Sequence, residues 1–187
     1  IIVVLTGIAV TSQSSFNKTL ILSNTAYDIA LTLRSAETYG LGSRAFGAAA
    51  NTGYGVSIMA AEPGAFTFFA DTYPAPSEFS VCHPTSDASA PDARPGDCAY
   101  EPNSDERVVD YALGNGITIS DFCAFSLGSW SCAHAQGGGL YSLDIVFARP
   151  NPSPFMSANG SYSADFPVTA ACLAITFLWV VPYYRDT

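Results

Sequence analysis

The chain begins with IIVVLTGIAV at residues 1–10, and TSQSSFNKTLILSNTAYDIALTLRSAETYGLG follows at residues 11–42. Thr6 is the only polar side chain of the first stretch, and the second carries apolar or small residues at spacings of three and four. Such spacing is typical of a helix with one apolar face, and no proline interrupts it before Pro63. The two stretches together predict one long helix, apolar on all sides at first and amphipathic afterwards.

The predicted helix runs from residue 1 to about residue 39, a length of about 58 Å at 1.5 Å per residue. Gly40 and Gly42 are expected to end it, because glycine is favoured just past a helix C-terminus. The stripe expected to pack on the rest of the protein comprises Leu22, Ala26, Ile29, Leu33 and Ala36. Residues of low helix propensity mark an expected flexible point in the first part. They are Gly7, Ser12, Ser14 and Ser15.

Residues 1–10 are too short to cross a bilayer by themselves, because a membrane-spanning helix needs about 20 apolar residues. They are interpreted as the second half of a membrane helix, so that the native protein is expected to be about ten residues longer at its N-terminus. The alternative is a buried strand of a core sheet, which leaves the amphipathic stretch that follows unexplained.

From Gly53 onward the apolar residues alternate with polar ones, which is the pattern of strands. Strands are predicted at residues 54–60, 65–71, 107–113, 116–122, 140–148, 161–168 and 171–181. Gly114, Asn115 and Gly116 form a turn signal that predicts a hairpin between two of these strands. The last strand is continuously apolar, so it is expected either inside a sheet or covered by a neighbouring molecule.

The predicted fold class is therefore α+β, with a long N-terminal helix packed on an antiparallel sheet. Residues 1–15 are assigned to a hydrophobic segment, and residues 16–187 to a globular head that includes the amphipathic helix 16–39. Two long loops, 72–105 and 124–139, are rich in small and polar residues. A chain of this length is enough for one domain with a sizeable core.

Four of the five cysteines fall into two local pairs, and each pair brackets a loop. Disulfides are predicted between Cys82 and Cys98 and between Cys123 and Cys132, which favours an oxidising, extracytoplasmic compartment. Cys172 lies in an apolar run and is expected to be a buried free thiol. Structural zinc is not predicted, because the chain has no CxxC pair and only two histidines.

The charge balance bears on the partners of the protein. Among 187 residues there are seven Lys and Arg against sixteen Asp and Glu, a formal net charge of −9. Such a chain repels nucleic acid, which is therefore not an expected partner. Charged residues make up 12 % of the chain, about half the ordinary share, and apolar residues 49 %. Much of the surface is expected to be shared with other molecules or with lipid.

The sequence does not indicate catalysis, a cofactor or a metal. Several acidic residues gather in one region without the spacing of a calcium-binding EF-hand loop, and they are interpreted as a solvated acidic loop. They are Asp92, Asp97, Glu101, Asp105, Glu106 and Asp110. The serines lack a GxSxG motif, and no set of Ser, His and Asp motifs follows the N-terminus. The protein is therefore not expected to be an enzyme.

Several segments, taken in order, resemble the type IV pilin and type II secretion pseudopilin superfamily, in particular H-type pseudopilins and related pilins. They are IIVVLTGIAVTSQSS at 1–15, NTGYGVSI at 51–58, FTFFAD at 66–71, DERVVDYALGNGITIS at 105–120 and LDIVFARPNPSPFMS at 143–157. The resemblance implies a pilin-like fold that covers most of the chain. Family members begin with an aromatic residue and carry a glutamate a few positions on, and this chain contains neither at its start.

The resemblance implies a structural subunit that polymerises into an extracellular cell-surface filament. The implied partners are other copies of the chain, the inner membrane before assembly and the pilus assembly machinery. The helix residues implied to contact neighbouring helices in the filament core are Ile1, Ile2, Val3, Val4, Leu5, Ile8 and Val10.

Two alternatives to a filament subunit stay open. One is a minor pseudopilin that caps or primes a short secretion pseudopilus. The other is a secreted, disulfide-containing binding module that uses loops 72–105 and 124–139 for recognition. Asn17 and Asn159 lie in sequons for N-linked glycosylation, although such triplets also arise by chance.

Overall fold

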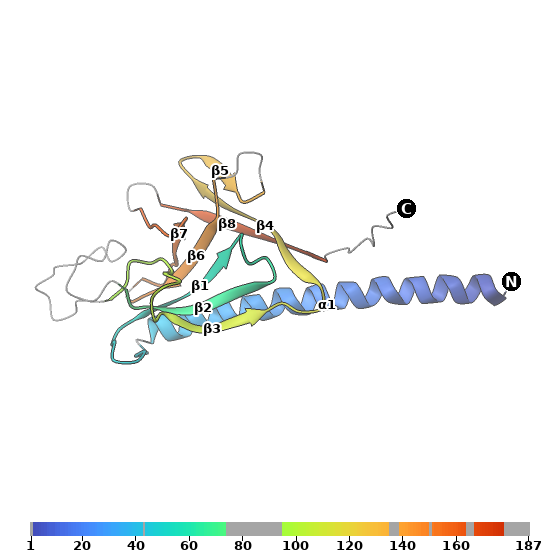
Figure 1. Cartoon of the computed structure of the whole chain (residues 1–187), viewed down its shortest axis with the longest axis horizontal. Helices are drawn as coiled ribbons and strands as arrows, with labels where there is room; N and C mark the ends of the chain where they lie inside the picture. The colour runs from blue at the N-terminus through green and yellow to red at the C-terminus, as the bar shows by residue number, and fades with distance from the viewer. Residues whose placement is uncertain are drawn as a thin grey trace, which may run out of the picture.

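The computed structural model describes residues 2–42, 44–73, 95–134, 139–149, 151–163 and 167–177, with side chains of the helix described from residue 17. These residues form one α-helix, α1 (Ile2–Leu41), and eight strands (Figure 1). The strands are β1 (Gly53–Met59), β2 (Ala65–Asp71), β3 (Arg107–Ala112), β4 (Ile117–Ser126), β5 (Ser129–Cys132), β6 (Ser142–Phe147), β7 (Phe155–Ala158) and β8 (Ala170–Phe177).

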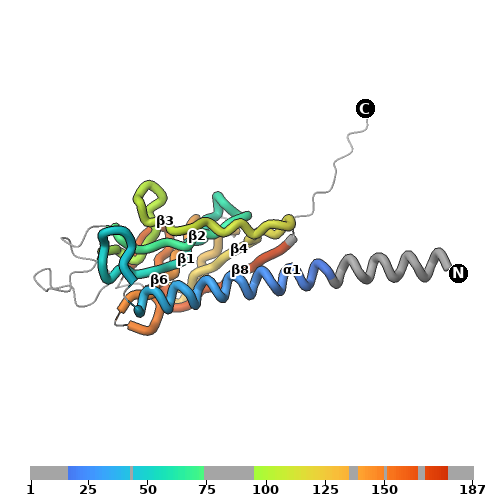
Figure 2. The backbone as a smooth tube through the Cα atoms, turned by 90° about the horizontal axis from the view of Figure 1, so that it is seen from below, coloured from blue at the N-terminus to red at the C-terminus, as the bar shows by residue number. Residues whose placement is uncertain are grey.

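The strands form two antiparallel sheets. The first has the order β3-β2-β1-β6-β7, and the second has the order β5-β4-β8. Helix α1 contacts β1, β6 and β8, so that it touches both sheets. Figure 2 shows the helix on the same side as β6 and β8, and Figure 1 shows its N-terminal end extending beyond the sheets.

The main core lies between the C-terminal part of α1 and the sheets. Ile29 and Ala36 of the helix are buried in it, and β1, β2, β4 and β6 supply most of the other side chains. Three rings meet near the end of the helix, where Tyr39 lies edge-on to Tyr54 and Phe68 with centroids 5.5 and 5.9 Å away. Aromatic packing of this kind contributes beyond the area that it buries.

Gly40 marks the closest approach of α1 to the first sheet. A Cβ atom at this position would lie 1.9 Å from the backbone oxygen of Phe147, in β6. Only glycine allows the helix to lie so near the strand, because any side chain would overlap the backbone of that strand. Ala36, one helical turn earlier, is also fully buried, so small side chains bring this end of α1 close to β6.

We therefore expect Gly40→Ala to lower the free energy of unfolding by about 1–3 kcal/mol, because the helix must shift to relieve the overlap. The matched control is Gly64→Ala, at a turn where an added Cβ meets no atom within 4 Å, and we expect it to change stability by less than about 0.5 kcal/mol. Urea denaturation followed by circular dichroism measures both. Equal stabilities of the two variants would contradict the close approach at Gly40.

The predicted fold class, an α+β pilin-like fold with a helix packed on one antiparallel sheet, is wrong. The described residues contain eight strands and a single helix, and the strands divide into two sheets, so the fold is mostly β. The sequence pattern was misinterpreted because alternation shows that a segment is a strand but not which strand it pairs with.

The predicted hairpin at the turn Gly114–Gly116 is also wrong. β3 pairs with β2, whereas β4, after the turn, pairs with β5 and β8 of the other sheet. All three turn residues have positive φ angles, between 51° and 71°, which glycine and asparagine tolerate best. The turn signal was therefore real, but it marks the passage between two sheets.

Further differences concern the ends of the strands. The predicted loop 124–139 contains the end of β4 and all of β5, and β7 lies where no strand was predicted. The predicted strand 161–168 contains no strand among its described residues. Helix α1 ends at Leu41 and is continuous through the expected flexible point and across the expected boundary at residues 15 and 16. In the described part of the chain, no helix combines the length and the apolar character needed to span a membrane.

Candidate functional site

The inner face of α1 differs in part from the predicted packing stripe. Ile29 and Ala36 are buried, Leu33 packs against the core and Leu22 is half-buried, whereas Ala26 is exposed. Two threonines that the prediction passed over are buried on this face instead. They are Thr25 and Thr32.

These threonines are tolerated in the core because their hydroxyls are satisfied within the helix. The Thr25 hydroxyl donates to the carbonyl oxygen of Ile21 at 3.0 Å, and the Thr32 hydroxyl donates to that of Asp28 at 2.9 Å. A threonine bonded to the preceding turn presents mainly its methyl group to the core. The two threonines are seven residues apart and lie on the same helix face as Ile29. This spacing was the signal in the sequence that could have predicted their burial.

The opposite face of α1 carries three exposed apolar side chains among polar ones. Leu20, Tyr27 and Leu31 are 45, 64 and 44 % exposed, and their spacings of seven and four place them on one side of the helix. A groove of about 360 Å³ runs beside this face, between α1 and β3, and Leu31 and Tyr111 lie among its lining residues. The helix therefore carries apolar residues both toward its own sheets and away from them.

The residues implied for the filament core lie at the start of α1. Ile2, Val3, Val4, Leu5, Ile8 and Val10 are part of the helix, and their side chains lie outside the described part of the chain, as does all of Ile1. The expected flexible residues Gly7, Ser12, Ser14 and Ser15 are helical, and their side chains are likewise outside it. Their contacts in an assembly stay a prediction.

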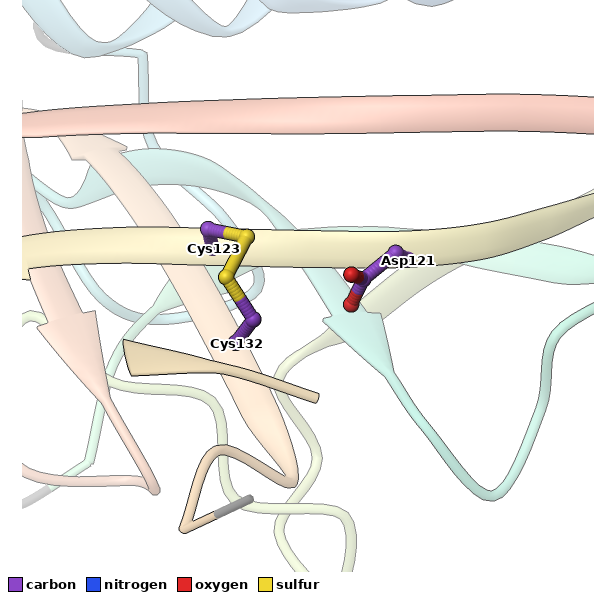
Figure 3. Close-up of side chains that lie close together, drawn as sticks. All are labelled: Asp121, Cys123 and Cys132. Carbon is purple, nitrogen blue, oxygen red and sulfur yellow. A yellow bond between two sulfur atoms is a disulfide. The ribbon is translucent and has the colours of Figure 1, made fainter. Parts of the chain in front are cut away.

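The structure joins Cys123 of β4 to Cys132 of β5, which are directly opposite each other in the sheet (Figure 3). Cys98 is disulfide-bonded, and its predicted partner Cys82 lies outside the described residues. Cys172 is a free cysteine, but it is exposed on β8 and not buried as expected. The apolar run around it misled the prediction, because alternate side chains of β8 point away from the core.

Asp121, Cys123 and Cys132 bring three metal-ligand atoms within 4.8 Å of one another (Figure 3). Both sulfur atoms are bonded to each other, so neither is available as a thiolate ligand. The Asp121 carboxyl is also engaged, since its Oδ1 accepts hydrogen bonds from the backbone N–H groups of Phe122 and His134 at 2.9 and 3.0 Å. The trio therefore does not form a metal site in this state.

Two buried carboxyls hold the segment 95–106 against the end of β2. Asp71 is fully buried and accepts the backbone N–H groups of Asp97 and Cys98 at 3.0 and 2.9 Å. Glu106 is equally buried and accepts three backbone N–H groups, those of Thr72, Tyr73 and Glu101, at 2.7–3.0 Å. The acidic run was interpreted as a solvated loop, but its member Glu106 is a structural anchor, as is Asp71 at the end of β2.

The same anchors place several acidic groups close together. Burial raises the pKa of Asp71 well above its ordinary value, and the charge of Glu106 raises it further. Burial, together with the hydrogen bond and charge of Glu106, raises the pKa of Glu101 to about 10. The Glu101 carboxyl therefore keeps its proton at neutral pH.

A third buried carboxyl, that of Asp144, lies inside the first sheet. Asp144 of β6 is 1 % exposed and stands directly opposite Ser57 of β1. Among the described residues, no group makes a hydrogen bond of acceptable geometry to either Asp144 oxygen or to the Ser57 hydroxyl. Burial raises the pKa of Asp144 to about 7, although the nearby Ser57 and the backbone of Tyr100 favour its charged form.

Asp144 belongs to a polar row that crosses the first sheet. Thr67, Ser57, Asp144 and Ser157 are consecutive partners in the strand register, and all four are buried. The ends of the row are satisfied, because the Thr67 hydroxyl donates to Asp110 at 2.9 Å and the Ser157 hydroxyl donates to the carbonyl oxygen of Cys98. The row was not visible in the sequence, because it exists only once the strands are in register.

The two glycosylation sequons lie in different surroundings. Asn17 is exposed on α1. Asn159 follows β7 with a φ of 59°, and its side-chain amide donates to the carbonyl oxygen of Gly139 while its Oδ1 accepts the N–H of Tyr141 at 2.8 Å. A glycan on Asn159 would disturb these bonds, so the structure favours Asn17 over Asn159 as an acceptor.

Comparison with known proteins adds no relative from which a function can be transferred. No protein-family model, no curated protein and no solved structure matches this chain. The function must therefore be argued from the residues themselves.

Proposed function

We propose that this chain is a structural subunit that polymerises into an extracellular, type IV pilus-like helical filament through its N-terminal helix. The observation that carries the proposal is that α1 is much longer than the part of it that its own sheets cover. The helix extends over 40 residues, whereas Thr25 is the first buried residue among the side chains described from Asn17 onward. Figure 1 shows the N-terminal end of α1 beyond the sheets.

The composition of the uncovered end supports assembly. Nine of the ten residues at 1–10 are apolar or glycine, and exposing apolar surface to water costs about 25 cal/mol per Å². Lipid covers such a segment before assembly, and helices of neighbouring copies cover it in a filament. Because lipid is as apolar as leucine, the transfer from lipid to a helix bundle gains packing and little hydrophobic free energy.

The outer face of α1 extends this surface toward the sheets. Leu20, Tyr27 and Leu31 add exposed apolar side chains along the helix on the side that its own sheets leave open. Different faces of one helix then contact different neighbouring copies. Head-to-tail contacts between unlike faces close into a ring only when the rotation from one copy to the next allows it. Repeated contacts of this kind generate a helical filament.

The test is electron microscopy of surface material from cells that express the full-length chain, as wild type and as Leu5→Glu. We expect helical filaments with an axial bundle of helices from the wild type and none from the variant, because a carboxylate buried in an apolar bundle costs several kcal/mol. Leu5→Met is the matched control and is expected to form filaments, since the swap keeps volume and apolarity.

Each outcome separates the proposal from its alternatives. Filaments from Leu5→Glu would contradict the role of the helix, provided that circular dichroism shows the head folded in all three proteins. A monodisperse soluble wild-type monomer would contradict assembly itself and would favour a secreted binding module. Short assemblies that form only with a second, more abundant subunit would favour a minor pseudopilin.

A further inference from the structure

Three cysteines lie in one row across the second sheet. Cys123 of β4 stands directly opposite Cys132 of β5 on one side and directly opposite Cys172 of β8 on the other. Residues directly opposite in a sheet project from the same face. The neighbours of Cys123 along β4, Phe122 and Ala124, are buried in the core, so the three cysteines project from the other face of the sheet.

Only one pair in this row is bonded, although Cys123 faces a cysteine on each neighbouring strand. Cys123 and Cys132 form the disulfide, and Cys172 is free and exposed. Figure 3 shows this disulfide on β4, and β8 is the other strand that pairs with β4. The Ala133 N–H donates to the carbonyl oxygen of Phe122, so Cys123 and Cys132 form a non-hydrogen-bonded pair. Cys123 and Cys172 then form a hydrogen-bonded pair, whose Cα atoms lie about 5.5 Å apart, within the Cα range of disulfides.

We propose that Cys172 exchanges with the Cys123–Cys132 disulfide, so that the crosslink at Cys123 moves between β5 and β8. The Cys172 thiolate attacks Sγ of Cys123, a Cys123–Cys172 bond forms, and the Cys123–Cys132 bond breaks. Cys132 leaves as a thiolate and takes up the proton that Cys172 lost. One disulfide and one thiol are present before and after, so the step needs no oxidant or reductant.

Asp121 bears on the rate of this exchange. One of its carboxylate oxygens lies within 4.8 Å of both bonded sulfur atoms, and the residue is on the same strand as Cys123 (Figure 3). Its negative charge opposes the departure of Cys132 as a thiolate and the approach of any thiolate from solution. Cys172 is held beside Cys123 by strand pairing, so it retains access that a thiol in solution lacks.

The exchange has a structural consequence. In the observed state the crosslink closes a short hairpin between residues nine apart in sequence. After exchange it joins β4 to β8, which follows much later in the chain, and β5 is held by hydrogen bonds alone. The proposal goes beyond filament assembly and does not depend on it, because it concerns the second sheet of a single subunit.

The test follows the disulfides of the purified full chain by mass spectrometry. The oxidised protein is held folded at pH 8.5, samples are quenched in acid with N-ethylmaleimide, and chymotrypsin is included because it cuts at Phe125 and Trp130, between Cys123 and Cys132. We expect a Cys123–Cys172 peptide and alkylated Cys132 to appear together, at a rate independent of protein concentration. Cys172→Ala should retain only Cys123–Cys132.

Two further variants keep the proposal falsifiable. Cys132→Ser leaves Cys123 and Cys172 as thiols, and oxidised glutathione is expected to convert them to a Cys123–Cys172 disulfide. Asp121→Asn, which retains the Oδ1 acceptor, is expected to speed the wild-type exchange about two- to fivefold at low salt. The proposal is overturned if Cys172 stays fully alkylated in the wild type and Cys132→Ser yields only mixed disulfides with glutathione. It is also overturned if Cys172 bonds to a cysteine other than Cys123.

Discussion

Replacing Asp144 by asparagine is expected to make the protein more stable than the wild type at pH 8. At pH 4 the two proteins are expected to differ much less in stability. Asp144 is 1 % exposed, and its carboxyl oxygens accept no hydrogen bond of acceptable geometry from the described residues. The ionised carboxylate therefore loses its water on folding with little to replace it. Asparagine has nearly the same shape and carries no charge at any of these pH values.

The sign of the pH dependence follows from the raised pKa. Burial raises the pKa of Asp144 from 3.8 to about 7, so between these values the folded state holds a proton that the unfolded state has lost. Stability is then greatest below about pH 4, falls as the pH rises and becomes level above about pH 7. At 1.36 kcal/mol per pKa unit, Asp144 accounts for at most about 4 kcal/mol of this fall.

Urea denaturation of wild type and Asp144→Asn at several pH values measures the effect. We expect the difference in unfolding free energy between the two proteins to shift by about 2–4 kcal/mol in favour of the variant between pH 4 and pH 8. A constant offset from packing cancels in this comparison. Some pH dependence should persist in the variant, because the pKa values of Asp71 and Glu101 are raised in the same direction.

The control for this experiment is Asp105→Asn. Asp105 is exposed near the same segment, so its replacement should leave the pH profile parallel to that of the wild type. If the stability difference between Asp144→Asn and wild type is the same at pH 4 and pH 8, Asp144 does not hold a proton in the folded protein at neutral pH.

Truncating Glu106 is expected to lower the free energy of unfolding by about as much as the Asp144 substitution changes it, but for a different reason. Its two carboxyl oxygens accept three backbone N–H groups, from Thr72, Tyr73 and Glu101, and the side chain is fully buried. Glu106→Ala leaves these donors without their acceptor, and each buried donor left unpaired costs about 1–3 kcal/mol. Water can enter part of the space and pair with some of these donors. We therefore expect the free energy of unfolding to fall by about 3–5 kcal/mol in total.

Hydrogen exchange locates this effect in the structure. In Glu106→Ala the amides of Thr72, Tyr73 and Glu101 should exchange much faster, while amides of β1, in the middle of the sheet, change only with global stability. Glu106→Gln is the matched variant: it retains one acceptor oxygen, so we expect an intermediate loss. Unchanged protection at these three amides in Glu106→Ala would show that other groups hold the segment.

Local pattern predicted some elements well and others poorly. The long helix ends within two residues of its predicted end, and β2 has the predicted bounds, because both are defined by periodicity within one segment. The hairpin between 107–113 and 116–122 was wrong because β3 pairs with β2 and β4 pairs with β5 and β8, so that the two adjacent strands belong to different sheets. Thr25 and Thr32 were missed because a buried hydroxyl bonded within its own helix looks like a polar surface residue in the sequence.

In the candidate sites, too, features set by nearby residues were predicted, and features set by strand pairing were not. The Cys123–Cys132 pair was anticipated because both residues lie close together in sequence around a short loop, but the place of Cys172 in the same row depends on the pairing of β4 with β8. The acidic run suggested solvent exposure, since charged residues are rarely buried without a partner. Backbone N–H groups supply that partner for Glu106 of this run, as they do for Asp71 of β2, and only folding brings them together.

The sequence by itself determined the long helix with its apolar start, most of the strands that follow it, and the acidic charge balance. Each of these depends on residues near one another in the chain or on composition alone. Only the tertiary structure decided that the strands form two sheets, that Asp144 is buried opposite Ser57, and that three cysteines share one row. The physical reason is register: a shift of one residue between two strands moves every side chain to the opposite face, and the partner strand sets that register.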